Sequence, residues 1–412
     1  MNRSNDVNQM IKGKISGLWN NFNSDRDFTL FLVVGIFAGI ASGINSTVFN
    51  NFLSDVYKLS AQARGIVEFP RELPGVFIVV VLGLLSFLGN IRMASLGMLA
   101  ASLGMLGLGL FSPTFAIMLM WMMVLSLGTH IVMPITPVIG MNLSKKENYG
   151  ARLGRYSAYS LSATILGYAI VWFGFKFLRF TYQTAFVIAA IFYIFAAFSI
   201  RLINPGKSSV KKVRFVFRKK YTLYYILSIV NGARKQIFIT FAPWVLIQMY
   251  HVDPPVFAIL GVVISLVSIL TRTIVGRMID IKGERFILSL EALILIVVCM
   301  GYSFAADLVP AGIAVVIIAV CYIIDNSMSA VEMARSTYIK KIAVHPDDVT
   351  PTLAAGTSFD HVVAMSIPFF GGLLWASLGY QFVFLAAAVI AVINLILSRQ
   401  IKIENCETAL EL

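Results

Sequence analysis

Residues 276–285 read GRMIDIKGER, and this stretch separates two long apolar segments. Gly276 and Gly283 stand seven residues apart, with the acid Asp280 between them and basic residues on both sides. Glycine permits a tight turn between two helices because it has no side chain that would clash. Charged side chains are costly inside a bilayer, so they favour a turn at its surface. The stretch therefore predicts a short polar turn between two membrane-crossing helices.

The composition of the whole chain is that of a membrane protein. Of its 412 residues, 58% are hydrophobic and 13% are charged, whereas soluble domains average about 45–50% and about 25%. One crossing needs about 20 apolar residues, so the chain has room for about a dozen crossings with short loops. These figures exclude a soluble enzyme, a disordered chain and a coiled coil. Three cysteines are too few for a disulfide framework.

Apolar runs follow one another along the chain and predict an all-α membrane protein with twelve transmembrane helices. A basic stretch at 204–221 separates the first six runs from the last six, which predicts two six-helix bundles at 28–203 and 222–399. Residues 1–27 form a cytoplasmic leader, either a helix lying on the lipid headgroups or a disordered basic segment, and 400–412 form a cytoplasmic tail. The runs cover about 28–53, 65–88, 92–111, 115–138, 154–175, 183–202, 222–247, 256–276, 285–304, 310–333, 354–376 and 381–398.

The basic residues mark the orientation of the chain. With the N-terminus in the cytoplasm, 25 of the 33 Lys and Arg residues fall on the cytoplasmic side, 4 in outer loops and 4 within helices. The positive-inside rule then places both termini in the cytoplasm. The net charge of +13 follows from this topology and from attraction to anionic lipid, so it does not call for a nucleic-acid partner. We expect a monomer in the plasma (inner) membrane, without a cofactor.

The 276–285 stretch resembles the signature loop of the major facilitator superfamily, G-x-x-x-D-x-x-G-x-R/K. The first-half counterpart, GLLSFLGNIR at 83–92, lacks the acid and has one residue fewer between its glycines. The resemblance implies two pseudo-symmetric bundles around a cavity lined by the first, fourth, seventh and tenth helices, and transport by alternating access. It also implies that the loop gates the inner face through Gly276, Arg277, Asp280, Gly283 and Arg285.

Two cations stand at mid-membrane in the seventh predicted helix. Arg234 and Lys235 lie about twelve residues, or about 18 Å, from either end, which is too far for their side chains to reach the surface. They need an anionic ligand, water or an acidic partner. Asn231 lies one turn before Lys235. We interpret the three as the floor of a cavity that binds an anionic or polar substrate, and pairing with a neighbouring acid is the alternative.

Acids and histidines lie at a common depth in later helices. Asp325, Asp360 and His361 can take up and release protons as access switches, which predicts proton coupling; a buried acid paired with Arg234 or Lys235 is the alternative. Aligning Lys145-Lys146 with Lys340-Lys341 superposes His130 on Asp325, so these two are expected to face each other and to contact substrate or relay protons. A metal site made of His130, His361, Asp325 and Asp360 is chemically possible, but no tight ligand spacing supports it.

Further charges lie nearer the helix ends. Glu68, Arg71 and Glu72 can pair with one another near the outer end of the second helix, as an interfacial ion-pair network or as an outer gate. Pro70 and Pro74 predict that this helix is kinked or starts late. Three further expectations follow. Arg272 and Glu291 neutralise each other. Glu332 and Arg335 meet Arg277 and Asp280 as an inner latch, which the resemblance implies is broken in the inward-open state. Asn45 lines the site or bonds a neighbouring helix.

The sequence lacks the motifs of other functional classes. It has no phosphate-binding G-x-x-x-x-G-K-S/T loop, no H-E-x-x-H and no C-x-x-C. We therefore expect a secondary active transporter, driven by protons, that moves a small, anionic organic solute across the lipid bilayer. A drug/proton antiporter is the first alternative, and an intramembrane enzyme or a lipid flippase is the alternative from another class.

Overall fold

The computed structural model describes residues 26–143, 149–204, 218–345 and 348–402. The predicted leader, most of the predicted linker, Lys145-Lys146 and the tail beyond residue 402 lie outside these residues. The regular elements of the described residues are all helical. The first half contains α2 (Arg26–Tyr57), α3 (Ala61–Val76), α4 (Ile78–Leu85), η1 (Ser86–Leu88), α5 (Gly89–Leu110), α6 (Phe115–Asn142), α7 (Tyr149–Phe177) and α8 (Tyr182–Arg201).

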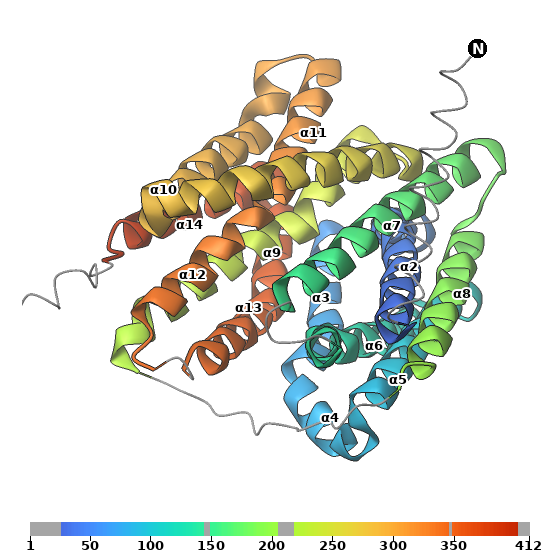
Figure 1. The fold of residues 1–412 in the computed structure, drawn as a ribbon. Coiled ribbons are helices and arrows are strands. Elements are labelled where there is room, and N and C mark those ends of the chain that lie inside the picture. Colours follow the sequence, from blue (N-terminus) through green and yellow to red (C-terminus); the bar gives the residue numbers. More distant parts are fainter. Residues whose placement is uncertain (1–25, 144–148, 205–217, 346–347, 403–412) are drawn as a thin grey trace, which may run out of the picture.

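The second half follows the same plan (Figure 1). It contains η3 (Lys219–Tyr221), α9 (Thr222–Tyr250), α10 (Pro254–Leu308), α11 (Ala311–Ser327), η4 (Met328–Val331), α12 (Glu332–Ile342), α13 (Val349–Leu378) and α14 (Tyr380–Ser398).

The described helices include nine that are long and apolar enough to cross a membrane. Two of these, at 61–110 and 254–308, have 50 and 55 residues, about twice what one crossing needs. Each turns at a glycine with positive φ, 72° at Gly89 and 79° at Gly283, a conformation that side chains disfavour. We interpret each of the two as two crossings, and with α9 the described helices then account for the twelve expected.

The signature stretch forms its turn at one residue. Gly283 is the only non-helical residue within α10, so the polar turn predicted at 276–285 is confirmed. Gly276 instead lies inside the helix, and a side chain there would meet no atom within 4 Å. The turn therefore depends on the second glycine of the motif alone.

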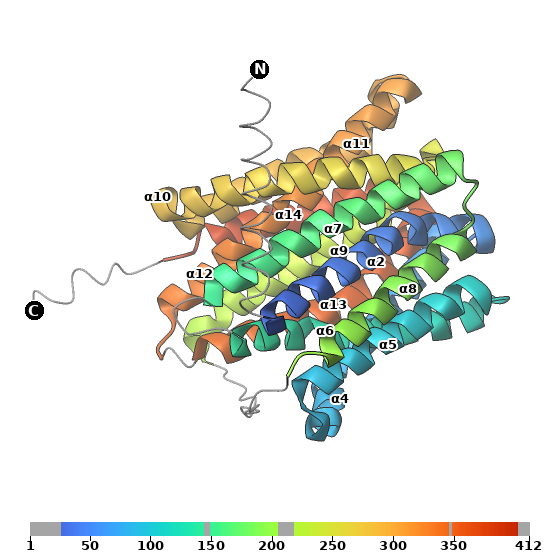
Figure 2. The same cartoon turned by 45° about the vertical axis from the view of Figure 1, so that its right-hand side comes forward.

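The two halves meet through two pairs of helices. α3 packs along α13, and α7 packs along α10; Figures 1 and 2 show α7 beside the yellow first part of α10. Glycines allow the close approach: a Cβ on Gly65 would lie 2.1 Å from the carbonyl oxygen of Pro368, and one on Gly372 would lie 2.8 Å from Cα of Gln62. The absence of side chains at these positions thus sets the distance between α3 and α13.

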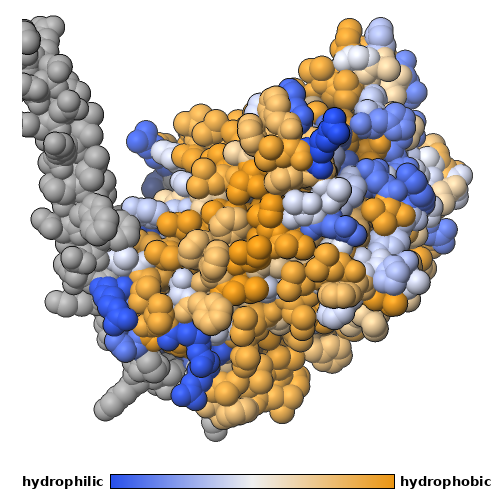
Figure 3. Space-filling view, turned by 90° about the vertical axis from the view of Figure 1, so that its right-hand side faces the viewer, coloured by the Kyte–Doolittle hydropathy of each residue, from blue (hydrophilic) through white to orange (hydrophobic). Residues whose placement is uncertain are grey.

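The surface around the bundle is apolar, as contact with lipid requires. Figure 3 shows a broad hydrophobic face with hydrophilic residues gathered toward its edges. Large exposed side chains include Leu99 and Leu103 of α5, Phe173 of α7, and Phe195 and Phe198 of α8. Because this surface faces outward, the charged side chains of the helices gather inside, between the two halves.

Candidate functional site

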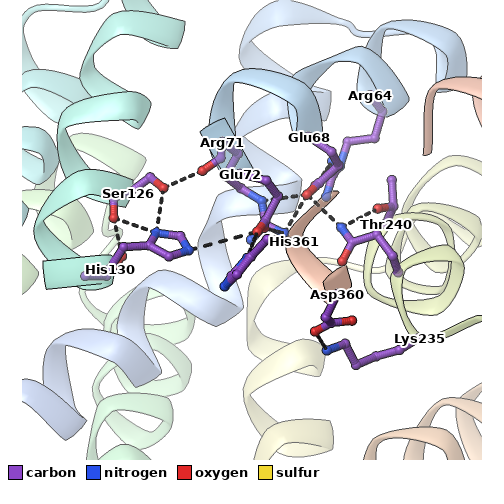
Figure 4. A network of polar contacts seen from close by, with 12 residues as sticks. Arg64, Glu68, Arg71, Glu72, Ser126, His130, Lys235, Thr240, Asp360 and His361 are labelled. Carbon is purple, nitrogen blue, oxygen red and sulfur yellow. Dashed lines mark hydrogen bonds and ion pairs between the residues drawn. The ribbon is translucent and has the colours of Figure 1, made fainter. Parts of the chain in front are cut away.

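A chain of ion pairs runs along the face of α3 that contacts the second half (Figure 4). Nη1 of Arg64 lies 2.5 Å from Oε1 of Glu68, and Nη2 of Arg71 lies 2.5 Å from Oε2 of Glu68 and 2.9 Å from Oε1 of Glu72. Gln236 of α9 donates to Glu68 at 2.9 Å. The Glu68 side chain has no exposed surface, so its charge depends on these partners.

This network lies deeper than the sequence predicts. α3 begins at Ala61, where Ser60 caps it, and runs through Pro70 and Pro74 to a break at Phe77. Glu68 and Glu72 are thus about 10 and about 16 Å from its start. The predicted pairing of Glu68, Arg71 and Glu72 with one another is confirmed. Glu68 and Glu72 are more buried than an interfacial network implies, because α3 faces the second half, where charged side chains find partners.

Glu72 joins α3 to two histidines from other helices. Its Oε2 lies 2.9 Å from Nδ1 of His361 on α13 and 4.0 Å from Nε2 of His130 on α6. The two imidazole rings are 5.1 Å apart, centroid to centroid. His130 also bonds through Nδ1 to the backbone oxygen of Ser126, at 2.8 Å. One carboxylate and two imidazoles therefore meet where the halves touch, and we call them the Glu72 triad.

A small cavity adjoins the Glu72 triad on the side of the first half. Its volume is about 110 Å³, and Asn45, Arg71, Glu72, Thr129 and His130 are among the residues that line it. The side-chain oxygen of Asn45 is buried and has no hydrogen-bond partner among the described residues. Two of the predicted substrate contacts, Asn45 and His130, are thus brought to one cavity.

Each deep cation of α9 is paired with an acid. Nη1 of Arg234 lies 2.6 Å from Oδ1 of Asp325 on α11, and Asn231 accepts a longer bond of 3.4 Å from Nη2. Lys235 donates to Asp360 on α13. The structure thus shows the pairing with neighbouring acids, the alternative to free cations.

The two pairs differ in exposure. The side chains of Arg234 and Asp325 are 6% and 11% exposed, whereas those of Lys235 and Asp360 are 41% and 23% exposed. The first pair is therefore enclosed by protein, whereas the second can be reached from outside the packed helices.

The predicted meeting of His130 with Asp325 is wrong. His130 contacts Glu72, His361 and Ser126, whereas Asp325 is bound by Arg234. Aligning two lysine pairs fixes a position along the chain, but it does not fix which neighbouring helix a side chain meets. The four residues of the possible metal set are not brought together: His130 and His361 lie against Glu72, whereas Asp325 and Asp360 lie against Arg234 and Lys235.

One predicted contact near the cytoplasmic end is wrong, and the predicted latch is not formed in this structure. Glu291 pairs with Arg335 at 2.9 Å instead of with Arg272. Arg335 in turn binds Glu332 at 2.9 Å, and Arg277 and Asp280 are exposed and form no ion pair within the described chain. Arg335 and Glu291 are 3% and 1% exposed, so this pair stabilises the second half internally and does not latch one half to the other.

The sequence does not predict that Arg64 and Gln236 belong to the ion-pair network of α3. The topology count places Arg64 in an outer loop, but it lies in α3, 2% exposed. Its spacing from Glu68, Arg71 and Glu72 by four, seven and eight residues places all four on one helical face, and this signal could have found it. Gln236 carries no such signal, because an isolated glutamine reveals its partner only in the folded chain.

An all-helical membrane bundle in two halves, with ion pairs buried at their contact, is the architecture of a secondary transporter. The sequence model of the Major Facilitator Superfamily matches residues 72–358, and the chain belongs to this family. It is a transporter and not an enzyme. No curated protein matches the chain in sequence.

Solved structures share the fold at low sequence identity. A point mutant of the nucleoside transporter NupG has a TM-score of 0.73 at 12% identity, and the match covers 90% of this chain and 98% of that one. A bacterial homolog of the human lysosomal transporter Spinster, inward-facing and occupied, has 0.70 at 16%, covering 90% and 95%. A D-xylose-proton symporter has 0.67 at 12%, covering 90% and 96%. These likenesses establish the fold alone.

Proposed function

We propose that this transporter moves a small organic anion and that protons drive the movement. The proposal depends most on the exposed pair of Lys235 and Asp360. Lys235 is the deep cation that a solute can reach. A carboxylate or phosphate group of the solute would replace Asp360 as the partner of Lys235. Arg234, Asn231 and Asp325 would form the fixed floor beside it, and Asn45 and His130 would contact the solute from the first half.

The balance of charges supports a role for protons. Four deep cations, Arg64, Arg71, Arg234 and Lys235, face four deep carboxylates, Glu68, Glu72, Asp325 and Asp360. A bound anion adds one negative charge to this neutral set, and an uncompensated charge is costly at mid-membrane. A proton that enters with the anion removes the excess. We propose that this proton is carried by Asp325, Asp360 and His361, as the sequence predicts.

Contacts between the halves support an inward-open state. At the end we assign to the outside, Asn51 donates to the backbone oxygen of Val252 and Gln248 donates to Ser54, both at 2.8 Å. At the opposite end, α4 packs mainly on α5 and α6 of its own half. We place the protein in the plasma membrane as a monomer with cytoplasmic termini, and we keep the loop of Gly276 to Arg285 as its inner gate.

Uptake by proteoliposomes tests this function. Binding raises thermal stability by mass action, so a screen of organic acids, sugars, peptides and cationic dyes against the purified protein selects the solute. An inwardly directed proton gradient should then drive its uptake, and Lys235→Gln should reduce the initial rate at least about tenfold, as loss of one charged contact of about 1.4 kcal/mol or more does.

The matched control for this variant is Lys176→Gln, because Lys176 lies at the end of α7 beside Trp172. Its uptake should equal that of the wild type. Unchanged uptake by Lys235→Gln would refute the proposed anion site, and selection of lipophilic cations in the screen would favour a drug/proton antiporter instead.

A further inference from the structure

We propose that the Glu72 triad binds a divalent transition-metal ion, with Zn²⁺ as the representative ion, between the two halves of the transporter. One carboxylate oxygen and two unprotonated imidazole nitrogens are ligands that zinc accepts. Nδ1 of His361 donates to Oε2 of Glu72, so it would release its proton to solvent as the ion binds. The ligand atoms of Glu72, His130 and His361 all lie within 4.8 Å of one another. Bound to one zinc ion at about 2.0–2.2 Å each, they would be about 3.4 Å apart, so the side chains need to shift by about 1 Å.

His130 is already oriented as a ligand. Its Nδ1 bonds to the backbone oxygen of Ser126 at 2.8 Å, and a carbonyl oxygen can only accept, so Nδ1 carries the proton. The lone pair is then on Nε2, the nitrogen that faces Glu72. A ligand histidine usually donates its other ring N–H to a carbonyl or carboxylate in this way. The hydrogen bond thus fixes both the tautomer and the direction of the ring.

Gly75 allows both histidines to approach α3 closely. A Cβ on Gly75 would lie 2.6 Å from Nε2 of His130 and 3.1 Å from Nδ1 of His361, so any other residue at this position would collide with the ring of His130. Gly75 follows Glu72 by three residues on the same face of α3. The adjoining cavity of about 110 Å³ is lined by Glu72 and His130, and it can supply water as the fourth ligand of an open zinc site.

The surrounding charges permit a cation here. The nearest cation is Arg71, which lies 2.9 Å from Oε1 of Glu72 and 2.5 Å from Oε2 of Glu68. Arg64 and Arg71 are matched by Glu68 and Glu72, so the α3 network is neutral before the ion binds, and the loss of the His361 proton offsets part of the charge that the ion brings. Arg71 holds Oε1, whereas the histidines approach Oε2. The carboxylate can therefore keep Arg71 on one oxygen and bind the ion with the other.

The metal would join the two halves. Glu72 lies on α3 and His130 on α6, both in the first half, whereas His361 lies on α13 in the second. An ion bound by all three stabilises the arrangement in which α3 and α13 are in contact, and any state that separates them must release it. We therefore expect Zn²⁺ to hold the transporter in one state. This site does not depend on the proposed anion and proton transport.

Metal binding to the purified full-length protein in detergent tests the site. Co²⁺ should give the visible absorption of an ion with nitrogen ligands, saturating at one ion per chain, and Zn²⁺ should displace it. Zn²⁺ should also raise the unfolding temperature followed by tryptophan fluorescence, whereas Mg²⁺ should not, because Mg²⁺ prefers oxygen ligands. His130→Gln and His361→Gln should each weaken Zn²⁺ binding by about 100-fold, the upper range reported for loss of groups around a metal.

Two further variants keep the result interpretable. Gly75→Ala keeps all three ligand residues, but its Cβ would lie 2.6 Å from Nε2 of His130 and would push that ring away from Glu72, so it should abolish the Co²⁺ spectrum even where a histidine variant folds poorly. His251→Ala removes an exposed histidine outside the Glu72 triad and should bind Co²⁺ as the wild type does. Absence of Zn²⁺ stabilisation in the wild type, or equal binding by Gly75→Ala and wild type, would overturn the proposal.

Discussion

The α3–α13 interface and the α7–α10 interface join the same two halves, but they differ in chemistry. The first carries buried charges, with Glu68 fully buried and Glu72 bonded to His361 across the contact. The second is formed by small and aromatic residues: the ring of Tyr168 lies against Gly261, and its hydroxyl is within hydrogen-bonding reach of Ser46 and Ser265.

The two interfaces correspond to each other in the fold, so the difference in their chemistry comes from their side chains and not from the arrangement of the backbone. If the halves are matched helix by helix, α3 corresponds to the first crossing of α10 and α7 corresponds to α13. We propose that the uncharged interface mainly holds the halves together and that the charged interface, which includes α13 with Asp360, takes part in transport.

Glu68 gives the largest expected effect on stability. Glu68→Gln leaves Arg64 and Arg71 without their shared carboxylate at a site without solvent, and breaking a buried ion pair costs about 3–5 kcal/mol. Denaturant unfolding in detergent should show this loss. The matched change at the other interface, Ser265→Ala, should cost about 1 kcal/mol, and equal losses would remove the contrast between the interfaces.

Close packing of α3 on α13 gives the next largest effect. Gly65→Ala places a Cβ against the backbone of Pro368, and overpacking costs about 1–3 kcal/mol. Gly276→Ala is the control, because a Cβ there meets nothing within 4 Å and alanine is favoured over glycine within a helix by about 0.5–1 kcal/mol. A Gly65→Ala protein as stable as Gly276→Ala would show that the helices are less close than described.

A substitution at Tyr168 tests how much the uncharged α7–α10 interface contributes to stability. Tyr168→Phe keeps the ring against Gly261 and removes only the hydroxyl, so it should reduce the free energy of unfolding by about 0.5–1.5 kcal/mol. Uptake of solute should be unaffected. Loss of transport in this variant would place function at both interfaces and contradict the assignment to α3 and α13.

The smallest expected effect on stability concerns Asp348, which we place outside the membrane. The hydroxyl of Tyr221 at 2.6 Å and the guanidinium of Arg218 at 2.8 Å hold the pKa of the Asp348 carboxyl below its usual value. A lowered pKa stabilises the fold above the unfolded pKa of about 3.9, and this contribution is lost as the pH falls through the folded pKa. Asp348→Asn should therefore lower the unfolding temperature at pH 7, and the difference from wild type should shrink below a pH of about 4.

The sequence predicts the fold well because apolar length and the placement of Lys and Arg depend on the bilayer and not on tertiary contacts. It also predicts which charged residues lie within the helices, since Arg234, Lys235, Asp325 and Asp360 interrupt apolar runs. The sequence does not predict which of these side chains contact one another. Glu72 and His361 are 289 residues apart, and only the packing of α3 on α13 brings them together. The sequence underestimates the burial of Glu68 for a related reason: α3 faces protein and begins before its apolar run.

The central claim is that each anion enters with a proton. Proteoliposomes that contain the wild-type protein and a trapped pH indicator should acidify inside as the selected anion is taken up, and dissipating the proton gradient should stop net uptake. Uptake that proceeds at the same rate without a gradient, and without any change in internal pH, would contradict the claim.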